Sequence, residues 1–148
     1  MVELREINKD NYNECLNLKV AEDQTNFVAS NVYSLAQAWV YQKTAYPFAI
    51  YADGIMVGFV MMGFYEEKQV YTIWRFMIDT RFQGRGYGKK ALQLSIDYLC
   101  QEFDVNEIYL SFEQNNVVAE KLYYSLGFQR TGELAGDEIE MRLAIKKD

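Results

Sequence analysis

Short runs of hydrophobic residues in the middle of the chain predict three adjacent strands. Residues 48–52 and 55–65 are apolar and flank Asp53-Gly54, a dipeptide that favours a tight hairpin turn. A polar turn at 66–68 then leads into a third strand over residues 70–78. Strands joined by such short turns pair antiparallel, because a parallel pair needs a crossover of about a dozen residues or more. The middle of the chain therefore predicts an antiparallel sheet.

The apolar spacing changes to the helical period after residue 86. Hydrophobic residues recur at helical spacing across 86–103, with lysines and glutamines opposite, which predicts a helix that covers the sheet. The strand at 107–112 follows this crossover helix and should lie parallel to the strand at 70–78. This order predicts an α+β fold with a mixed, mostly antiparallel sheet. The other predicted elements are a strand over 2–7, helices beginning at Asn11 and at a Ser34–Gln37 capping box, a helix from Asn115 or Asn116 to Leu126, and a final hairpin of 128–134 and 138–145.

Length and composition predict a single domain over residues 1–148. Half of the residues are hydrophobic and one is proline, which suits one core and is too little for two domains. No apolar run approaches the roughly 20 residues that span a bilayer, and no signal-peptide core follows the charged N-terminus. Two cysteines are too few for a disulfide framework. We therefore expect a cytoplasmic protein with no membrane partner.

The ionisable residues limit the reactions and ligands that the chain can support. The chain contains no histidine, which excludes serine–histidine triads, imidazole bases and the commonest metal ligand, so we expect no metal. Carboxylates, tyrosines, backbone groups or water must then carry any proton transfer. The formal net charge of −6 argues against nucleic acid, whose binding depends on a basic surface, and favours a cationic small molecule.

The stretch from Arg81 to Lys90 is the strongest candidate binding site. Its glycines at 84, 86 and 88 allow left-handed backbone conformations and direct contact between backbone and ligand. Their amides and the N-terminus of the following helix suit a pyrophosphate, and Arg85, Lys89 and Lys90 add positive charge.

Three familiar loop types match this stretch less well. The first is a plain turn between strand and helix, but three alternate glycines exceed what a turn needs. The nucleoside-triphosphate loop G-x-x-x-x-G-K-[ST] cannot be aligned here, and Lys89 stands where the third glycine of the dinucleotide pattern G-x-G-x-x-G belongs.

Two motifs in this order resemble those of the GCN5-related N-acetyltransferase (GNAT) superfamily. The first is Arg81-x-Gln83-Gly84-x-Gly86-x-Gly88, and the second is Asn116-x-x-Ala119-x-x-Leu122-Tyr123-x-x-x-Gly127-Phe128. The order of predicted elements extends the resemblance over the whole chain. It implies the GNAT fold, a twisted sheet of about seven strands flanked by about four helices, and an N-acetyltransferase that uses acetyl-CoA as donor.

By the same resemblance, the strand before the glycine loop pairs through its backbone with the pantetheine arm. It does so near a bulge, where an unpaired N–H can polarise the thioester carbonyl. Tyr123 is implied to protonate the departing thiolate; a tyrosine packed on a helix face with its hydroxyl satisfied is the alternative. The implied cofactor-binding residues are Phe76, Met77, Ile78, Gln83, Gly84, Arg85, Gly86, Tyr87, Gly88, Lys89, Asn116 and Tyr123.

Three carboxylates are candidates for the base that deprotonates the amine. Many relatives carry a glutamate on the strand before the glycine loop, whereas alignment on that loop places Trp74 there. Glu113, just beyond the next strand, is one substitute, and Glu22 or Asp23 acting through water is another. The alternative for each is an exposed acid on a solvated loop.

Residues 21–31 and 34–38 resemble the bacterial spermine/spermidine (diamine) acetyltransferase branch. A polyamine is a flexible polycation, which acidic loops attract and aromatic rings cover through cation–π contact. We therefore predict direct attack by spermidine or spermine in a ternary complex. The alternatives are another amine (a peptide N-terminus, lysine or amino sugar) and a non-catalytic coenzyme A-binding regulatory module. The predicted substrate-binding residues are Glu22, Asp23, Phe27, Trp39, Glu66 and Trp74.

Two points stay open at this stage. The alternative for Phe27 and Trp39 is that they are core residues, and for Trp39 the two interpretations are about equally supported. Exposed edge strands and a high aromatic content leave room for a homodimer.

Overall fold

A computed structural model describes residues 1–20 and 30–146. In this part of the chain seven strands form one sheet in the order β1-β2-β3-β4-β5-β7-β6, in which β4 and β5 run parallel and the other neighbours antiparallel. The predicted α+β fold with a mixed, mostly antiparallel sheet is confirmed. The elements are β1 Val2–Glu6, α1 Tyr12–Leu16, α2 Asn31–Val40, β2 Ala45–Ala52, β3 Ile55–Tyr65, β4 Val70–Ile78, a 3₁₀ turn Thr80–Phe82, α3 Tyr87–Glu102, β5 Glu107–Phe112, α4 Val117–Ser125, β6 Gln129–Ala135 and β7 Glu138–Ala144.

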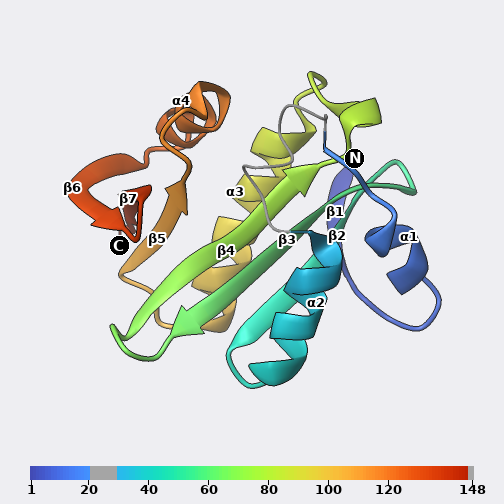
Figure 1. The fold of residues 1–148 in the computed structure, drawn as a ribbon, viewed down its shortest axis with the longest axis horizontal. Helices are drawn as coiled ribbons and strands as arrows, with labels where there is room; N and C mark the ends of the chain where they lie inside the picture. Colours follow the sequence, from blue (N-terminus) through green and yellow to red (C-terminus); the bar gives the residue numbers. More distant parts are fainter. Residues whose placement is uncertain (21–29, 147–148) are drawn as a thin grey trace.

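Helices cover both faces of the first four strands (Figure 1). α3 packs against β1, β3 and β4, whereas α1 contacts β3 and α2 contacts β2. Val60 and Met62 of β3 belong to the core under α3, and Phe59 and Met61 belong to the core under α1 and α2. Both faces of β3 are therefore buried, which explains its continuous apolar run.

The sheet splits between β4 and β5. These strands pair at only two positions, Tyr71 with Ile108 and Thr72 with Tyr109. Beyond them the two strands diverge, and Figure 1 shows β5 turning away from β4 towards α4. The predicted bulge lies at this point, because the β3–β4 register skips Trp74. A bulge bends and twists its strand, so it helps to open the sheet here.

The hairpin predicted at Asp53-Gly54 is confirmed. Both residues have positive φ, 50° and 83°, as a tight turn between antiparallel strands requires.

Two predictions near the N-terminus are wrong. α2 begins one turn earlier than the predicted Ser34–Gln37 capping box: Ser30 is the cap, and its hydroxyl accepts from the Tyr33 amide at 3.1 Å. Ser34 is buried inside the helix and donates to the Ser30 carbonyl at 3.0 Å. β2 also begins early and includes Pro47, which is tolerated because β1 pairs with β2 only from Phe48 onward.

No helix within the described residues is both long and apolar enough to cross a membrane.

Candidate active site

The glycine loop links the end of β4 to the start of α3. Gly84 and Gly86 have φ of 78° and 82°, and Gly86 is the N-terminal cap of α3. An added Cβ would meet nothing within 4 Å at either glycine, so glycine is needed for its backbone conformation and not for space. Gln83 fixes the loop by donating to the Ile78 carbonyl at 2.9 Å. The first turn of a helix has backbone N–H groups without partners inside the helix. In α3 these groups lie at the glycine loop, where they suit an anion.

A cavity of about 830 Å³ runs from this loop along β4 to α4; we call it the cofactor cavity. The β4 backbone beyond Thr72 has no partner on its β5 side among the described residues. Its N–H and C=O groups can therefore pair with an extended ligand. The predicted cofactor residues that line this cavity are Phe76, Met77, Ile78, Gln83, Gly84, Gly86, Tyr87, Gly88, Asn116 and Tyr123.

The structure leaves two predicted cofactor residues outside that lining. Arg85 and Lys89 are exposed. The Arg85 guanidinium lies 5.7 Å from the centre of the Phe82 ring and donates to the Arg81 carbonyl at 3.4 Å. The charges of both residues lie near the glycine loop, but neither residue lines the cofactor cavity.

Two residues of the second motif hold the α4 side of the cofactor cavity. Asn116 caps α4 by accepting from the Ala119 amide at 3.2 Å. Tyr123 is 8% exposed, and its ring lies between those of Phe112 and Phe128, with centroids 6.0 and 6.2 Å away. Burial, with a smaller contribution from the Glu138 charge, raises the pKa of Tyr123 to about 12. The phenol is therefore neutral at physiological pH and holds a proton that it can donate.

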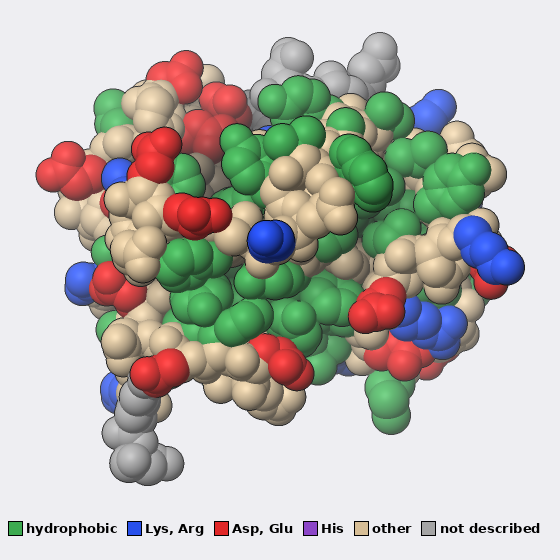
Figure 2. All heavy atoms as spheres, turned by 90° about the horizontal axis from the view of Figure 1, so that it is seen from below, with side chains coloured by type: hydrophobic (Ala, Val, Ile, Leu, Met, Phe, Trp, Pro, Cys, Tyr) green, Lys and Arg blue, Asp and Glu red, His purple; other side chains and the backbone are tan. Residues whose placement is uncertain are grey.

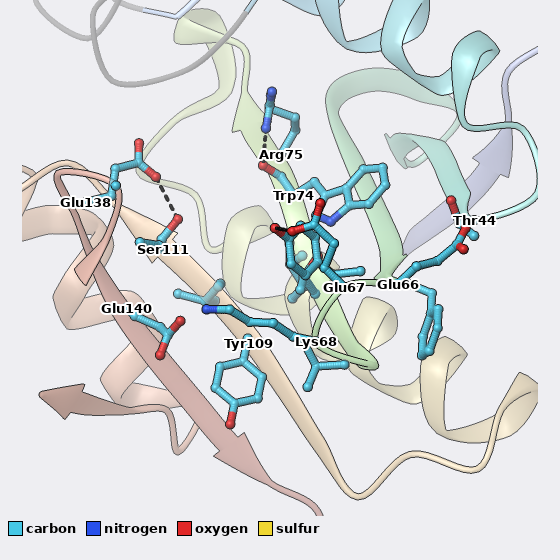
Figure 3. A pocket seen from close by; sticks show the side chains of 18 of the residues that line it. Thr44, Glu66, Glu67, Lys68, Trp74, Arg75, Tyr109, Ser111, Glu138 and Glu140 are labelled. Carbon is cyan, nitrogen blue, oxygen red and sulfur yellow. Dashed lines mark hydrogen bonds between the residues drawn. The ribbon is translucent and has the colours of Figure 1, made fainter. Parts of the chain in front are cut away.

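A second cavity of about 990 Å³ lies across β4, β5 and β7; we call it the acceptor cavity (Figure 3). Aromatic side chains line it together with five glutamates and two basic residues. Figure 2 views the molecule from below, the end that carries the β3–β4 turn in Figure 1. It shows acidic side chains around hydrophobic ones on this face. The charged lining residues are Glu66, Glu67, Glu107, Glu138, Glu140, Lys68 and Arg75.

The two cavities share a common wall, which we call the junction. It consists of Ile73, Trp74, Arg75, Ser111 and Glu138. The Ser111 hydroxyl donates to Glu138 Oε1 at 2.6 Å, which links β5 to the first residue of β7 (Figure 3). The wall shared by the two cavities thus carries a carboxylate hydrogen-bonded to a serine.

Trp74 occupies the junction because the opposite strand makes room for it. It is the extra residue of the β3–β4 bulge, and its ring lies against Gly63, where an added Cβ would stand 2.6 Å from the indole. The Tyr41 ring meets it edge-on, with centroids 6.1 Å apart. The indole supplies an aromatic wall at the position where many relatives carry a glutamate.

Arg75 follows Trp74 and points away from the centre of the acceptor cavity (Figure 3). Its guanidinium donates to the Trp74 carbonyl at 2.8 Å and to the Gln37 side chain of α2 at 3.2 Å. Its Nε is buried with no hydrogen-bond partner among the described residues. Arg75 thus connects α2 to the bulge.

The remaining predicted site residues are placed as follows. Glu66 lines the acceptor cavity, whereas Glu113 lines only the cofactor cavity. Trp39 is 72% exposed and lines neither, so its core alternative is wrong. Glu22, Asp23 and Phe27 lie outside the described residues.

Sequence reasoning missed Glu138 and Ser111. The alternation of β7 was a usable signal, because Glu138, Glu140 and Arg142 share one face opposite the buried Met141. The position of that face became evident only from the pairing of β7 with β5.

Comparison with known proteins agrees with this geometry. The model of the Acetyltransferase (GNAT) family matches residues 2–128. A spermine/spermidine N(1)-acetyltransferase of Bacillus subtilis is 36% identical over 141 residues, which cover 90% of this chain and 91% of that protein. The chain belongs to the GNAT family. It is an N-acetyltransferase that uses acetyl-CoA as its acetyl donor.

Solved structures share the fold at lower sequence identity. The spermidine N-acetyltransferase of Vibrio cholerae, in complex with CoA and spermine, has a TM-score of 0.76 at 18% identity, with 97% and 94% of the two chains covered. An aminoglycoside acetyltransferase in complex with coenzyme A has a TM-score of 0.78 at 17% identity, with 97% and 95% covered. Fold alone therefore does not select the acceptor amine.

Proposed function

We propose that this enzyme transfers an acetyl group from acetyl-CoA to a primary amine of a polyamine, by direct attack while both substrates are bound. The observation that carries the proposal is the junction, the five lining residues that the acidic, aromatic-lined acceptor cavity shares with the cofactor cavity. Direct attack requires the two reactants side by side, and a shared wall can hold them so.

The charge of the acceptor cavity supports a polycationic substrate. Five glutamates but only two basic side chains line the cavity, so its negative charge favours cations. The rings of Trp74, Tyr65 and Tyr109 are available to cover methylene groups or an ammonium group. A curated relative that matches nine-tenths of this chain is a spermine/spermidine acetyltransferase, which favours the same class of acceptor.

The residues of the site divide the chemical steps between them. An amine with a pKa near 10.4 is deprotonated in only about one molecule in a thousand at neutral pH, so a proton acceptor must act before attack. Acetyl-CoA supplies an activated acyl group as a thioester. Backbone N–H groups at the Trp74 bulge are available to polarise its carbonyl, and Tyr123 can protonate the leaving sulfur.

The test is a panel of acceptors with two readouts. Purified enzyme is incubated with acetyl-CoA and with spermine, spermidine, an amino sugar or a lysine-containing peptide, and released thiol and acetylated product mass are measured. We expect the polyamines to give the highest kcat/KM. Efficient acetylation of the sugar or peptide, with none of either polyamine, would contradict the proposal.

A further inference from the structure

Glu138 has a position that no other described carboxylate shares. Among the five residues that line both cavities it alone is acidic. The Ser111 hydrogen bond of 2.6 Å fixes one carboxylate oxygen and leaves the other available. The side chain is half-buried and lies beside Ser111 at the edge of the acceptor cavity (Figure 3).

We propose that Glu138 takes the proton from the attacking amine, and that Ser111 is its positioning residue. The inference rests on the proposed amine acceptor but not on that amine being a polyamine. Many relatives carry a glutamate on β4 where this chain has Trp74. The proposal assigns deprotonation of the amine to a carboxylate on β7 instead.

The other described glutamates are less well placed. Glu113 lines the cofactor cavity alone. Glu107 is paired with Arg142 at 3.4 Å and accepts from the Tyr109 hydroxyl at 3.1 Å. Glu140 accepts from the Thr131 hydroxyl at 2.9 Å.

Glu66 and Glu67 stand on the exposed turn between β3 and β4. They line the acceptor cavity without reaching the junction. Their place suits attraction of a cation better than proton transfer at the thioester.

The proposed step balances in protons and electrons. The ammonium gives one proton to the Glu138 carboxylate, and the nitrogen lone pair forms a bond to the acetyl carbonyl carbon. The carbon–sulfur bond breaks with its electron pair on sulfur, which takes the Tyr123 phenolic proton. The second nitrogen proton returns to the Tyr123 oxygen, and Glu138 releases its proton to solvent.

Charged residues of both cavities lie at or beside the junction with Glu138. Arg75 of β4 supplies the positive charge at the junction, and Glu140 of β7 and Glu113 beyond β5 are the nearby acids of the two cavities. Tyr123 of α4 faces it as a neutral phenol, since burial and the Glu138 charge raise the pKa of that phenol.

The experiment compares Glu138→Gln with Glu133→Gln, an exposed β6 residue that lines neither cavity and undergoes the same chemical change. Calorimetry should give an unchanged Kd for acetyl-CoA in both variants. Glu138→Gln should lower kcat about 100-fold or more at neutral pH, with a much smaller change in the KM of the amine, and lose the acidic limb of the pH profile. Glu138→Asp should recover part of the rate.

The pH dependence separates proton transfer from a structural role. The deficit of Glu138→Gln should shrink as pH rises towards about 10, where the amine deprotonates in solution. Ser111→Ala should show a weaker loss of the same form. A kcat within threefold of wild type, or a deficit equal at every pH, would overturn the proposal. The assay uses whichever amine the wild-type enzyme acetylates, so failure of the polyamine assignment is detected separately.

Discussion

The two cavities that meet at the junction are built from different materials. The ligand-binding groups that we identify in the cofactor cavity are chiefly backbone groups: the edge of β4 beyond Thr72, two glycines with positive φ and the first turn of α3. The acceptor cavity is lined by side chains from the β3–β4 hairpin and from β5 and β7, which lie about 30 residues or more further along the chain. A backbone site suits one invariable cosubstrate, whereas a side-chain site can change its acceptor within the same fold.

After Glu138→Gln, the largest effect is expected at Tyr123, which lines the cofactor cavity only. Tyr123→Phe keeps the ring between Phe112 and Phe128 and removes only the hydroxyl. We expect kcat to fall about 100-fold, because the thiolate loses its proton donor, while steady-state KM and calorimetric Kd for acetyl-CoA stay within about twofold. Wild-type turnover in this variant would remove Tyr123 from the chemistry.

A smaller effect is expected at Gly63 of β3, against which the Trp74 ring packs. Gly63→Ala places a Cβ against the Trp74 indole, so the ring must move. We expect a loss of about 1–3 kcal/mol in the free energy of unfolding and a raised KM for the amine, measured by urea denaturation and initial rates.

The control for Gly63→Ala is the same change in a Trp74→Ala background. Removing the indole removes the clash, so the second substitution should then have little effect on stability. Equal losses in both backgrounds would show that Gly63 is needed for another reason.

The next effect concerns Asp79, which directly follows β4 and ties Lys19 to Arg81 at the start of the glycine loop. It is 2% exposed and accepts from the Lys19 amide at 2.9 Å, the Arg81 amide at 2.9 Å and Arg81 Nε at 2.8 Å. Burial alone would raise its pKa, but the hydrogen bonds from Arg81 and Lys19 outweigh burial, and the pKa is lowered.

A lowered carboxyl pKa stabilises the folded protein at pH values above the unfolded pKa of about 3.9, and that contribution is lost as pH falls through the folded value. Asp79→Asn should therefore destabilise the protein by about 1–3 kcal/mol at neutral pH, with the difference narrowing in acid. Chemical denaturation from pH 3 to pH 7 measures this. A constant difference across the range would refute the ionic contribution.

The smallest effect is expected from Glu66 and Glu67, the exposed acidic residues at the edge of the acceptor cavity. The double variant Glu66→Gln/Glu67→Gln should raise the KM for spermidine severalfold at low salt and leave the KM for acetyl-CoA unchanged. Since salt screens exposed charges, the difference should fade as ionic strength rises. Initial rates at low and high ionic strength measure this difference, with Glu133→Gln as control. A KM for spermidine that changes neither with the double substitution nor with ionic strength would count against charge attraction.

Sequence reasoning succeeded where the structure depends on neighbouring residues. The Asp53-Gly54 hairpin, the glycine loop and the Asn116 cap are local, and the structure places all three as expected. The Ser34–Gln37 box failed because Ser30 offers a competing cap and Ser34 is buried against the core. Two equally good local signals stood one turn apart, and packing selected between them.

The acceptor region was harder to predict because long-range pairing creates it. Glu138 reaches the junction only because β7 inserts between β5 and β6 in the sheet. Trp74 reaches it only because the β3–β4 register skips one residue. The family resemblance predicted the bulge, but the neighbouring residues do not show which residue the register skips, nor where β7 inserts.

Initial-rate kinetics test the central claim most directly, that the junction brings both substrates together for direct transfer. Acetyl-CoA is varied at several fixed concentrations of spermidine, and thiol release is followed. Intersecting lines in the double-reciprocal plot are the predicted result, because both substrates must be bound before the acetyl group moves. Parallel lines, the pattern of an acetylated enzyme intermediate, would contradict it.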